Sequence, residues 1–328
     1  MRLDSRLGTL LLALALLASV WVVVRFTGPE QMPGPESLAA LAPPAGATLR
    51  DVLADGSPGP ELVVIPAGKY LMGSDGPHAK REEQPVREIV LSRPLGVART
   101  ETTVAEFARF VESAGYRVQR GCWYHSADGS WLENGSATWL APGFDQAEDY
   151  PVTCINHRDA SVYAAWLSQQ TGHHYRLPSE AEFEYFSRAG QAENYPAGQP
   201  DLSALCLAAN GADVSSKLSY GVDCNDGYTH TSPVGSFAAN AFGLHDTSGN
   251  LWEFTRDCWN PGFSGRWRTL FTRPPVDGSP WMRGDCRVKV LRGGSYLSSA
   301  ENLRLSRREH GSGALRVNRS GFRVVREL

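Results

Sequence analysis

The stretch Asn240–Asp257 reads NAFGLHDTSGNLWEFTRD, and the assignment of the fold starts from it. The stretch lacks helical or strand periodicity, but Asp246 and Glu253 bracket the triplet SGN at 248–250. Serine, glycine and asparagine allow the backbone to turn sharply or to adopt a positive φ. A turn of this kind points carbonyl oxygens inward beside two carboxylates, which is the ligand chemistry that calcium prefers. The alternative is a turn closed by an Asx hydrogen bond, with the neighbouring aromatic side chains buried.

The composition places the chain among globular proteins. It has 328 residues, 42% of them hydrophobic and 20% charged, which suits one large domain or two ordinary ones. The formal net charge of −3 gives no electrostatic basis for binding nucleic acid or an anionic membrane surface. We therefore expect a protein, peptide or small-molecule partner and no nucleic acid.

The first 27 residues predict export. Arg2 and Arg6 precede an uncharged apolar run at Leu7–Val24, which is just long enough to span a bilayer. The same pattern describes a secretory signal peptide, but no good small-x-small cleavage site follows the run. We therefore favour an uncleaved signal anchor. Because positive charge stays on the cytoplasmic side, either form places the rest of the chain in the periplasm, next to the inner membrane.

The remaining chain is predicted to consist of a linker and one domain. Residues 28–60 are rich in proline and glycine and form the linker, in which Leu49–Leu53 is predicted to be a short turn of helix. Residues 61–328 form the domain. Its first strands are predicted where β-branched and aromatic residues gather. These strands are Glu61–Ser74, Val86–Leu91 and Leu95–Ala98.

Three helices are predicted from one start signal, a capping residue followed three positions later by an acid. The capping residues are Thr103, Asn156 and Ser179, and glycines at positions 115, 172 and 190 end the helices. Between the first two helices, Gln119–Pro151 has no helical period, and it is expected to pack over the core or to wall a cleft. After position 190 the pattern predicts only short strands, turns and long loops.

Six cysteines are expected to staple these loops. An even number of cysteines in an exported domain indicates disulfides, and six allow 15 pairings. Their distribution along the chain favours sequential pairs. These are Cys122–Cys154, Cys206–Cys224 and Cys258–Cys286. A zinc site is the alternative, but the chain has no CxxC and no histidine at ligand spacing.

The opening stretch resembles the signature NxFGLxDMxGNVWEW of the formylglycine-generating, or sulfatase-modifying factor, family. Four further segments are similar to family motifs in the same order, from about Val63 to the C-terminus. They are Val64–Ser74 (VIPAGKYLMGS), Tyr175–Gly190 (YRLPSEAEFEYFSRAG), Val290–Tyr296 (VLRGGSY) and Gly321–Val325 (GFRVV). The resemblance implies the irregular α+β, loop-rich sulfatase-modifying-factor fold, which is C-type-lectin-like and has few short helices and strands.

The resemblance also implies two structural calcium sites. Each combines side-chain oxygens with backbone carbonyls, as calcium requires. One set of ligands corresponds to Asn210, Gly211, Asp226 and Tyr228. The other corresponds to Asp246, Gly249, Leu251 and Glu253, with the glycine and the leucine contributing carbonyls.

The copper site of the family is not expected in this chain. Family members oxidise a cysteine of a sulfatase to formylglycine with oxygen and a copper ion held by two cysteines. Those cysteines follow the RGGSW motif, where this chain has Ser298 and no cysteine after Cys286. A hydroxyl does not replace a thiolate as a copper ligand. Copper-dependent formylglycine generation is therefore not predicted, and any other redox metal is unknown.

Two functions remain from the sequence. One is an oxidative maturation enzyme of the periplasm that acts on a peptide-like or cysteine-containing substrate. It is similar in compartment, and in the missing cysteine pair, to the exported enzyme that oxidises the pyoverdine chromophore precursor. The other is a non-catalytic binding or accessory module on the same scaffold. From motif position, the candidates for a cleft are Ser298, Trp252, Arg304 and His310.

Overall fold

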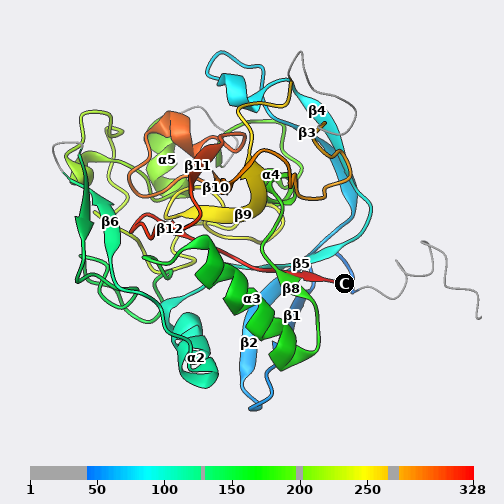
Figure 1. The fold of residues 1–328 in the computed structure, drawn as a ribbon. Coiled ribbons are helices and arrows are strands. Elements are labelled where there is room, and N and C mark those ends of the chain that lie inside the picture. The colour runs from blue at the N-terminus through cyan, green and yellow to red at the C-terminus, as the bar shows by residue number, and fades with distance from the viewer. Residues whose placement is uncertain (1–42, 127–129, 197–201, 265–272) are drawn as a thin grey trace, which may run out of the picture.

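The computed structural model describes residues 43–126, 130–196, 202–264 and 273–328. Within these ranges, two larger sheets and two small hairpins combine with short helices and long connecting loops (Figure 1). This arrangement confirms the irregular, loop-rich α+β architecture that the sequence predicts.

The first sheet joins the two ends of the described chain. Its strands are all antiparallel to their neighbours and lie in the order β1-β2-β5-β13-β8. The strands are β1 (Thr48–Val52), β2 (Pro58–Ile65), β5 (Leu95–Ala98), β13 (Val325–Glu327) and β8 (Tyr175–Arg176). Val63, Val97 and Val325 lie in register across the three central strands and are almost fully buried. The C-terminal strand therefore closes the core that the first strands begin.

The second sheet contains a strand formed by the end of the stretch Asn240–Asp257. Its order is β11-β10-β9-β12, with β12 parallel to β9 and the other pairs antiparallel. The strands are β9 (Trp252–Trp259), β10 (Asp285–Arg292), β11 (Glu309–Ser312) and β12 (Ser320–Gly321). The SGN turn leads directly into β9, so it fixes where the central strand of this sheet begins.

Three helices begin at the predicted capping residues. They are α2 (Val104–Ala114), α3 (His157–Thr171) and α4 (Glu180–Arg188), and each has a complete capping box. Gly115 and Gly172 end the first two in the left-handed conformation, whereas Ala189 ends the third, one residue before the predicted glycine. A further helix, α5 (Leu202–Ala208), was not predicted, because its short apolar sequence carries no capping signal.

Helices α2 and α3 lie beside the first sheet and complete the main core (Figure 1). An aromatic cluster forms the contact, in which Phe107 lies 6.1 Å from Tyr163 and 6.4 Å from Phe322 between ring centroids. All three rings are at most 1% exposed. Burying such rings supplies much of the hydrophobic stabilisation, and it anchors the C-terminal segment to the helices.

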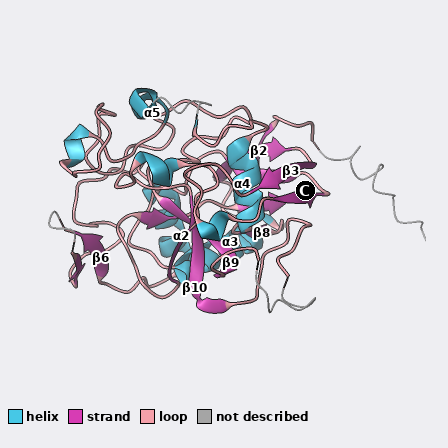
Figure 2. Ribbon diagram, turned by 90° about the horizontal axis from the view of Figure 1, so that it is seen from above, coloured by secondary structure: helices cyan, strands magenta, loops and turns pink. Residues whose placement is uncertain are grey.

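Two hairpins flank the sheets on opposite sides of the molecule (Figures 1 and 2). One consists of β3 (Gly68–Met72) and β4 (Arg87–Leu91), and the other of β6 (Cys122–His125) and β7 (Trp131–Asn134). The second hairpin belongs to the segment that was expected to pack over the core or to wall a cleft.

The structure confirms the three sequential disulfides. Cys122 pairs with Cys154, Cys206 with Cys224, and Cys258 with Cys286. No cysteine is free. Each bridge closes a loop of 18 to 32 residues, which stabilises the fold by about 3 kcal/mol in the loop-entropy model. The bridges hold loops that no regular sheet or helix would fix.

Several sequence predictions need correction. Residues 49–52 lie in a strand, β1, and not in a turn of helix, because they pair with β2. The predicted linker 28–60 therefore ends too late, and the domain begins before residue 61. The predicted strand 61–74 is two strands, β2 and β3, interrupted at Pro66 and Ala67.

The predicted signal anchor or signal peptide lies outside the described residues. Among the residues that the structure does describe, no helix has both the length and the apolar character needed to cross a membrane.

Candidate functional site

The SGN turn has the strained backbone that the sequence predicts. Asp246, Gly249 and Asn250 have φ values of 53°, 88° and 60°. A Cβ at Gly249 would lie 2.3 Å from the carbonyl oxygen of Asn210, so only glycine fits there. Asn250 donates from its backbone N–H to the same oxygen at 2.9 Å. The two oxygen-rich segments predicted from the sequence therefore lie side by side.

Three buried carboxylates next to the turn, those of Glu101, Asp246 and Glu253, interact electrostatically with the guanidinium of Arg323. Both carboxylate oxygens of Glu253 accept hydrogen bonds from Arg323, at 2.7–2.9 Å. Arg323 also donates to the carbonyl oxygens of His245 and Asp246. Glu101 accepts from the side chain of Asn250 at 2.7 Å. Burial, together with the charges of Asp246 and Glu253, raises the pKa of Glu101 well above its ordinary value.

This arrangement bears on the calcium site predicted at Asp246, Gly249, Leu251 and Glu253. Arg323 already supplies a positive charge to the Glu253 carboxylate and to the Asp246 carbonyl. The carboxylate of Asp246 accepts from the backbone N–H of Gly235 at 2.6 Å. A calcium ion here would therefore compete with a guanidinium for the same oxygens, and the site stays a prediction.

The other predicted calcium site offers a better fit. The side-chain oxygen of Asn210 is buried and has no hydrogen-bond donor among the described residues. The Asp226 carboxylate accepts backbone N–H groups from Gly211 and Tyr228 at 2.9 and 2.8 Å, which places it beside Asn210. Burial raises the pKa of Asp226 to about 6. An unpaired amide oxygen next to a destabilised carboxylate is the donor set that a hard cation satisfies.

Neither site depends on a cluster of acidic side chains. In the described ranges, no three His, Cys, Asp or Glu side chains are arranged to hold a metal. Each predicted site uses two side chains and takes its other oxygens from the backbone.

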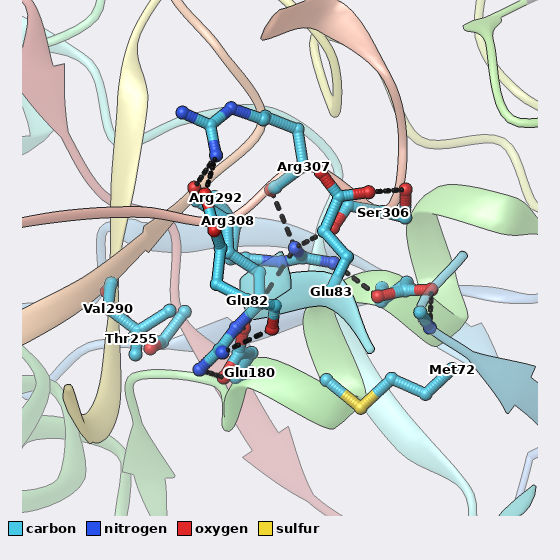
Figure 3. Close-up of polar contacts among 12 residues, drawn as sticks. Met72, Glu82, Glu83, Glu180, Thr255, Val290, Arg292, Ser306, Arg307 and Arg308 are labelled. Carbon is cyan, nitrogen blue, oxygen red and sulfur yellow. Dashed lines mark hydrogen bonds and ion pairs between the residues drawn. The ribbon is translucent and has the colours of Figure 1, made fainter. Parts of the chain in front are cut away.

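A buried network of ion pairs fixes the loop that follows β10. Both oxygens of Glu83 accept from Arg304 at 2.6 Å, and Glu83 also accepts from the Ser306 hydroxyl. Arg308 binds Glu180 at 2.5 and 2.9 Å. Figure 3 shows Glu83, Ser306, Glu180 and Arg308 close to Arg292, which lies in β10. The loop around residues 304–308 is thereby locked against α4 and against the short segment at 81–83.

The network holds its acids ionised despite their burial. Desolvation opposes ionisation of Glu83, but hydrogen bonds from Arg304 and Ser306 outweigh it and lower the pKa of Glu83. Desolvation likewise opposes ionisation of Glu180, whose pKa is lowered by the charges of Arg308 and Arg292. Buried pairs of this kind are stable only when every charge has partners, and these charges do.

The structure brings two of the four cleft candidates together. Ser298 and Trp252 line the same cavity of about 470 Å³. Arg304 does not reach it, because its guanidinium is buried against Glu83. His310 stacks on Trp259, with ring centroids 4.3 Å apart, and it does not line this cavity either. The Ser298 hydroxyl accepts the backbone N–H of Ser295 at 2.9 Å, so part of its role is to hold the loop.

A second cavity of about 520 Å³ adjoins the first. The two share His125 and Leu297 in their walls, and together they are called the cleft below. The hairpin β6–β7 forms one wall, as the sequence predicts for the segment 119–151. The other principal walls are the loop around Tyr296–Ser299 and the segment Asn318–Arg319.

Aromatic rings line much of the cleft. Trp131 and Tyr220 are 42% and 46% exposed, and both line the first cavity. In the second cavity, His230 stacks on Phe144 with centroids 4.6 Å apart and meets the edge of Tyr296. Desolvation lowers the pKa of His230, which favours its neutral, proton-accepting form.

Sequence reasoning missed most of these residues. Trp131, Tyr220 and Arg319 come from segments about 90 to 100 residues apart and carry no shared motif. Tyr296 could have been found, because it directly follows the glycine pair and serine of the RGGSY motif.

The comparisons with known proteins agree with this architecture. The sequence model of the sulfatase-modifying factor enzyme 1-like domain matches residues 50–328. The formylglycine-generating enzyme of Thermomonospora curvata is 30% identical over 303 residues, which cover 80% of this chain and 92% of that protein. The inactive C-alpha-formylglycine-generating enzyme 2 of Mus musculus is 28% identical over 271 residues, covering 74% of this chain and 76% of that protein.

A solved structure extends the likeness to three dimensions. PvdO from Pseudomonas aeruginosa has a TM-score of 0.71 and 32% identity to this chain, covering 88% of this chain and 100% of that one. The family match begins at residue 50, within β1, as the corrected domain boundary requires. With the motifs, the fold and these relatives in agreement, the chain belongs to the sulfatase-modifying factor family.

Proposed function

We propose that the protein is an oxidative maturation enzyme of the periplasm, which acts on a peptide-like or cysteine-containing substrate without a copper–cysteine site. The observation that carries this proposal is the cleft, whose two adjoining cavities meet at His125 and Leu297 beside Ser298. The cleft lies next to the loop that follows the RGGSY motif, where family members carry their cysteine pair.

The cysteines of this chain are committed to structure. All six form disulfides, so none provides a thiolate for copper or for a mixed disulfide with a substrate. The chemistry proposed here must therefore rely on other groups in the cleft. His230 offers a neutral imidazole, and His125 lies at the junction of the two cavities.

The proposed reaction is a two-electron oxidation by dioxygen. A C–H bond of the substrate and an adjacent N–H, O–H or S–H bond break, and a C=N, C=O or C=S bond forms. The two protons and two electrons pass to dioxygen, which becomes hydrogen peroxide. In this scheme His230 accepts one proton, since general bases act best when neutral at the working pH.

Calcium and export complete the proposal. Calcium would be held by the Asn210 side chain, the Gly211 and Tyr228 carbonyls, and Asp226, and its role would be structural. The N-terminal apolar segment would anchor the chain to the inner membrane, and the domain with its cleft would lie in the periplasm.

Oxygen uptake by the purified full-length protein tests the proposal. The protein is prepared with its disulfides oxidised and is incubated with peptides and cysteine-containing compounds encoded or produced near its gene. We expect substrate-dependent oxygen consumption, hydrogen peroxide in equal amount, and a product 2 Da lighter than the substrate. Loss of activity in His230→Gln, with normal folding, would support the assigned proton acceptor. The enzymatic proposal is abandoned if no candidate substrate stimulates oxygen uptake.

The second candidate function is a non-catalytic binding or accessory module. The observation that favours it is the Ser298 hydroxyl, which stands at the family's first cysteine position and is engaged in holding the loop. One of the relatives above is itself named inactive. Tight binding of a peptide with no chemical change in either partner would distinguish this function from catalysis.

A further inference from the structure

The cleft contains a guanidinium that has no ion-pair partner. Arg319 lies just before β12 and lines the same cavity as Ser298 and Trp252. Its backbone carbonyl accepts the N–H of Trp252 at 3.0 Å, which fixes where the residue sits. Among the described residues, no oxygen accepts a hydrogen bond from its guanidinium, and no carboxylate lies within ion-pair distance.

The cation–π contact of Arg319 leaves its hydrogen-bond donors available. Its guanidinium carbon lies 4.9 Å from the ring centroid of Trp131, in a cation–π arrangement. A cation–π contact is an attraction to the ring as a whole and satisfies none of the five N–H donors of a guanidinium with a hydrogen-bond acceptor. Arg319 remains charged at neutral pH, although burial lowers its pKa. A charged fork held over an exposed tryptophan is ready to bind a planar anion in bidentate fashion.

Other polar atoms around the cleft also lack partners. The indole N–H of Trp252 is buried, and no described group accepts from it. The side-chain oxygen of Asn318, next to Arg319, is likewise buried without a donor. Buried polar groups in folded proteins are nearly always hydrogen-bonded, and exceptions need an explanation. The two atoms lie beside different parts of the cleft, since Trp252 belongs to the wall of the first cavity and Asn318 to that of the second.

One carboxylate partly offsets the positive charge of Arg319 in this cavity. Glu309 lines the same wall, and its charge favours the protonated form of Arg319. Glu309 is itself held elsewhere, since it accepts the backbone N–H of His310 at 2.9 Å and lies 3.6 Å from Arg307. Its distance from Arg319 exceeds that of an ion pair. Glu309 therefore weakens the attraction for an anion without blocking the guanidinium.

We infer that the substrate carries a carboxylate that binds Arg319 and, next to it, an aromatic or similarly flat apolar group that packs against Trp131 and Tyr220. This deepens the proposed function, because it names the class of substrate for the same cleft. The carboxylate satisfies the free guanidinium, and the flat group covers the two exposed rings. The reacting part of the substrate would then extend towards His125 and His230.

Two small probes that differ only in charge test the inference. The full-length protein is titrated with 3-phenylpropionate and with 3-phenylpropionamide, and binding is followed by ligand-observed NMR. We expect saturable binding of the carboxylate, at least tenfold tighter than that of the amide, since charge-assisted pairs are the stronger ones. Arg319→Gln should remove this tenfold preference, and Arg319→Lys should restore part of it.

A variant that removes a negative charge from the cavity provides a second test. Glu309→Gln removes a negative charge that repels the carboxylate of the ligand, so it should tighten binding of 3-phenylpropionate by roughly two- to fivefold. It should leave binding of the uncharged amide unchanged. Arg287→Gln is the matched control, because Arg287 is exposed and pairs only with the neighbouring Asp285. It should affect neither probe.

The inference and the proposed function can fail separately. The inference is overturned if the carboxylate shows no saturable binding, if the amide binds equally well, or if Arg319→Gln leaves the affinity unchanged. None of these readouts involves oxygen. Charge-selective binding without oxygen uptake would keep the inference and remove the oxidative function. Oxygen uptake with an uncharged substrate that is indifferent to Arg319→Gln would do the reverse.

Discussion

The guanidinium of Arg304, in the buried network, is paired with a carboxylate, whereas within the described ranges the guanidinium of Arg319, in the cleft, is not. Arg304 is 2% exposed, binds both oxygens of Glu83 and also contacts Ser306. Arg319 rests on a tryptophan, and none of its N–H groups has an acceptor among the described residues. The difference teaches that the position of an arginine near a motif does not reveal its role until its partners are known. The buried, paired guanidinium of Arg304 holds the scaffold, and we propose that the guanidinium of Arg319 binds a ligand.

The largest expected effect on stability comes from removing Arg304 from the buried ion-pair network. Arg304→Ala leaves the Glu83 carboxylate buried without its guanidinium, and it should lower the free energy of unfolding by about 3–5 kcal/mol. Urea denaturation followed by circular dichroism measures the change. Arg287→Ala serves as the control, since its ion pair is exposed to solvent and should not alter the midpoint. A midpoint in Arg304→Ala equal to that of the wild type would mean that the network is not a structural element.

The next effect concerns a buried histidine at the start of α3. Burial, assisted by the charge of Lys289, lowers the pKa of His157 to about 4, and the ring contacts the Thr255 carbonyl. The unfolded chain therefore binds a proton between about pH 6.5 and pH 4 that the folded chain does not, so stability falls as the pH is lowered through this window. We expect the stability advantage of the wild type over His157→Gln to shrink by about 3 kcal/mol between pH 7 and pH 4.

Using the difference between the two proteins removes the contributions of other groups. Burial raises the pKa of Asp257 to about 7, so protonation of Asp257 makes the fold more stable as the pH falls. This contribution is the same in the wild type and in His157→Gln, and it cancels in the difference. A stability gap that does not change with pH would show that His157 is not held neutral in the folded state.

A smaller effect is expected from calcium. If Asn210 and Asp226 hold a calcium ion, adding calcium at a hundredfold excess over its dissociation constant should stabilise the fold by about 2.7 kcal/mol. Thermal unfolding with calcium and with a chelator measures this shift. Asp226→Asn should abolish it, whereas Asp277→Asn, in an exposed turn where Asp277 caps Ser279, should retain it. An equal calcium response in Asp226→Asn would place the ion elsewhere.

The smallest effect on stability is expected in the cleft. Because Arg319 has only its contact with Trp131 to lose among the interactions described, Arg319→Gln should lower the free energy of unfolding by no more than about 1 kcal/mol. The same urea titration that reports on Arg304→Ala measures it. A loss comparable to that of Arg304→Ala would make Arg319 a structural residue and would erase the contrast between the two regions.

The parts of the fold that follow from local chemistry were predictable. The capping boxes at Thr103, Asn156 and Ser179 each lie within four residues, and all three helices begin where they predict. The disulfides join cysteines 18 to 32 residues apart, so sequential pairing was readable from their distribution.

The parts that depend on distant contacts were not predictable. Arg304 was a cleft candidate because of its place after the RGGSY motif, but its partner Glu83 lies 221 residues earlier. The wall formed by Trp131, Tyr220 and Arg319 exists only after the hairpin β6–β7 has packed against the second sheet's loops. Likewise, β1 was missed because its only signal is its pairing with β2.

The most direct test of the contrast is a crystal structure of the protein with bound 3-phenylpropionate. We predict that the carboxylate lies within hydrogen-bond distance of the Arg319 guanidinium, that the phenyl ring packs on Trp131, and that the Arg304–Glu83 pair is unchanged. A structure in which Arg319 has turned to pair with Glu309, with the ligand bound elsewhere or absent from the cleft, would contradict the account.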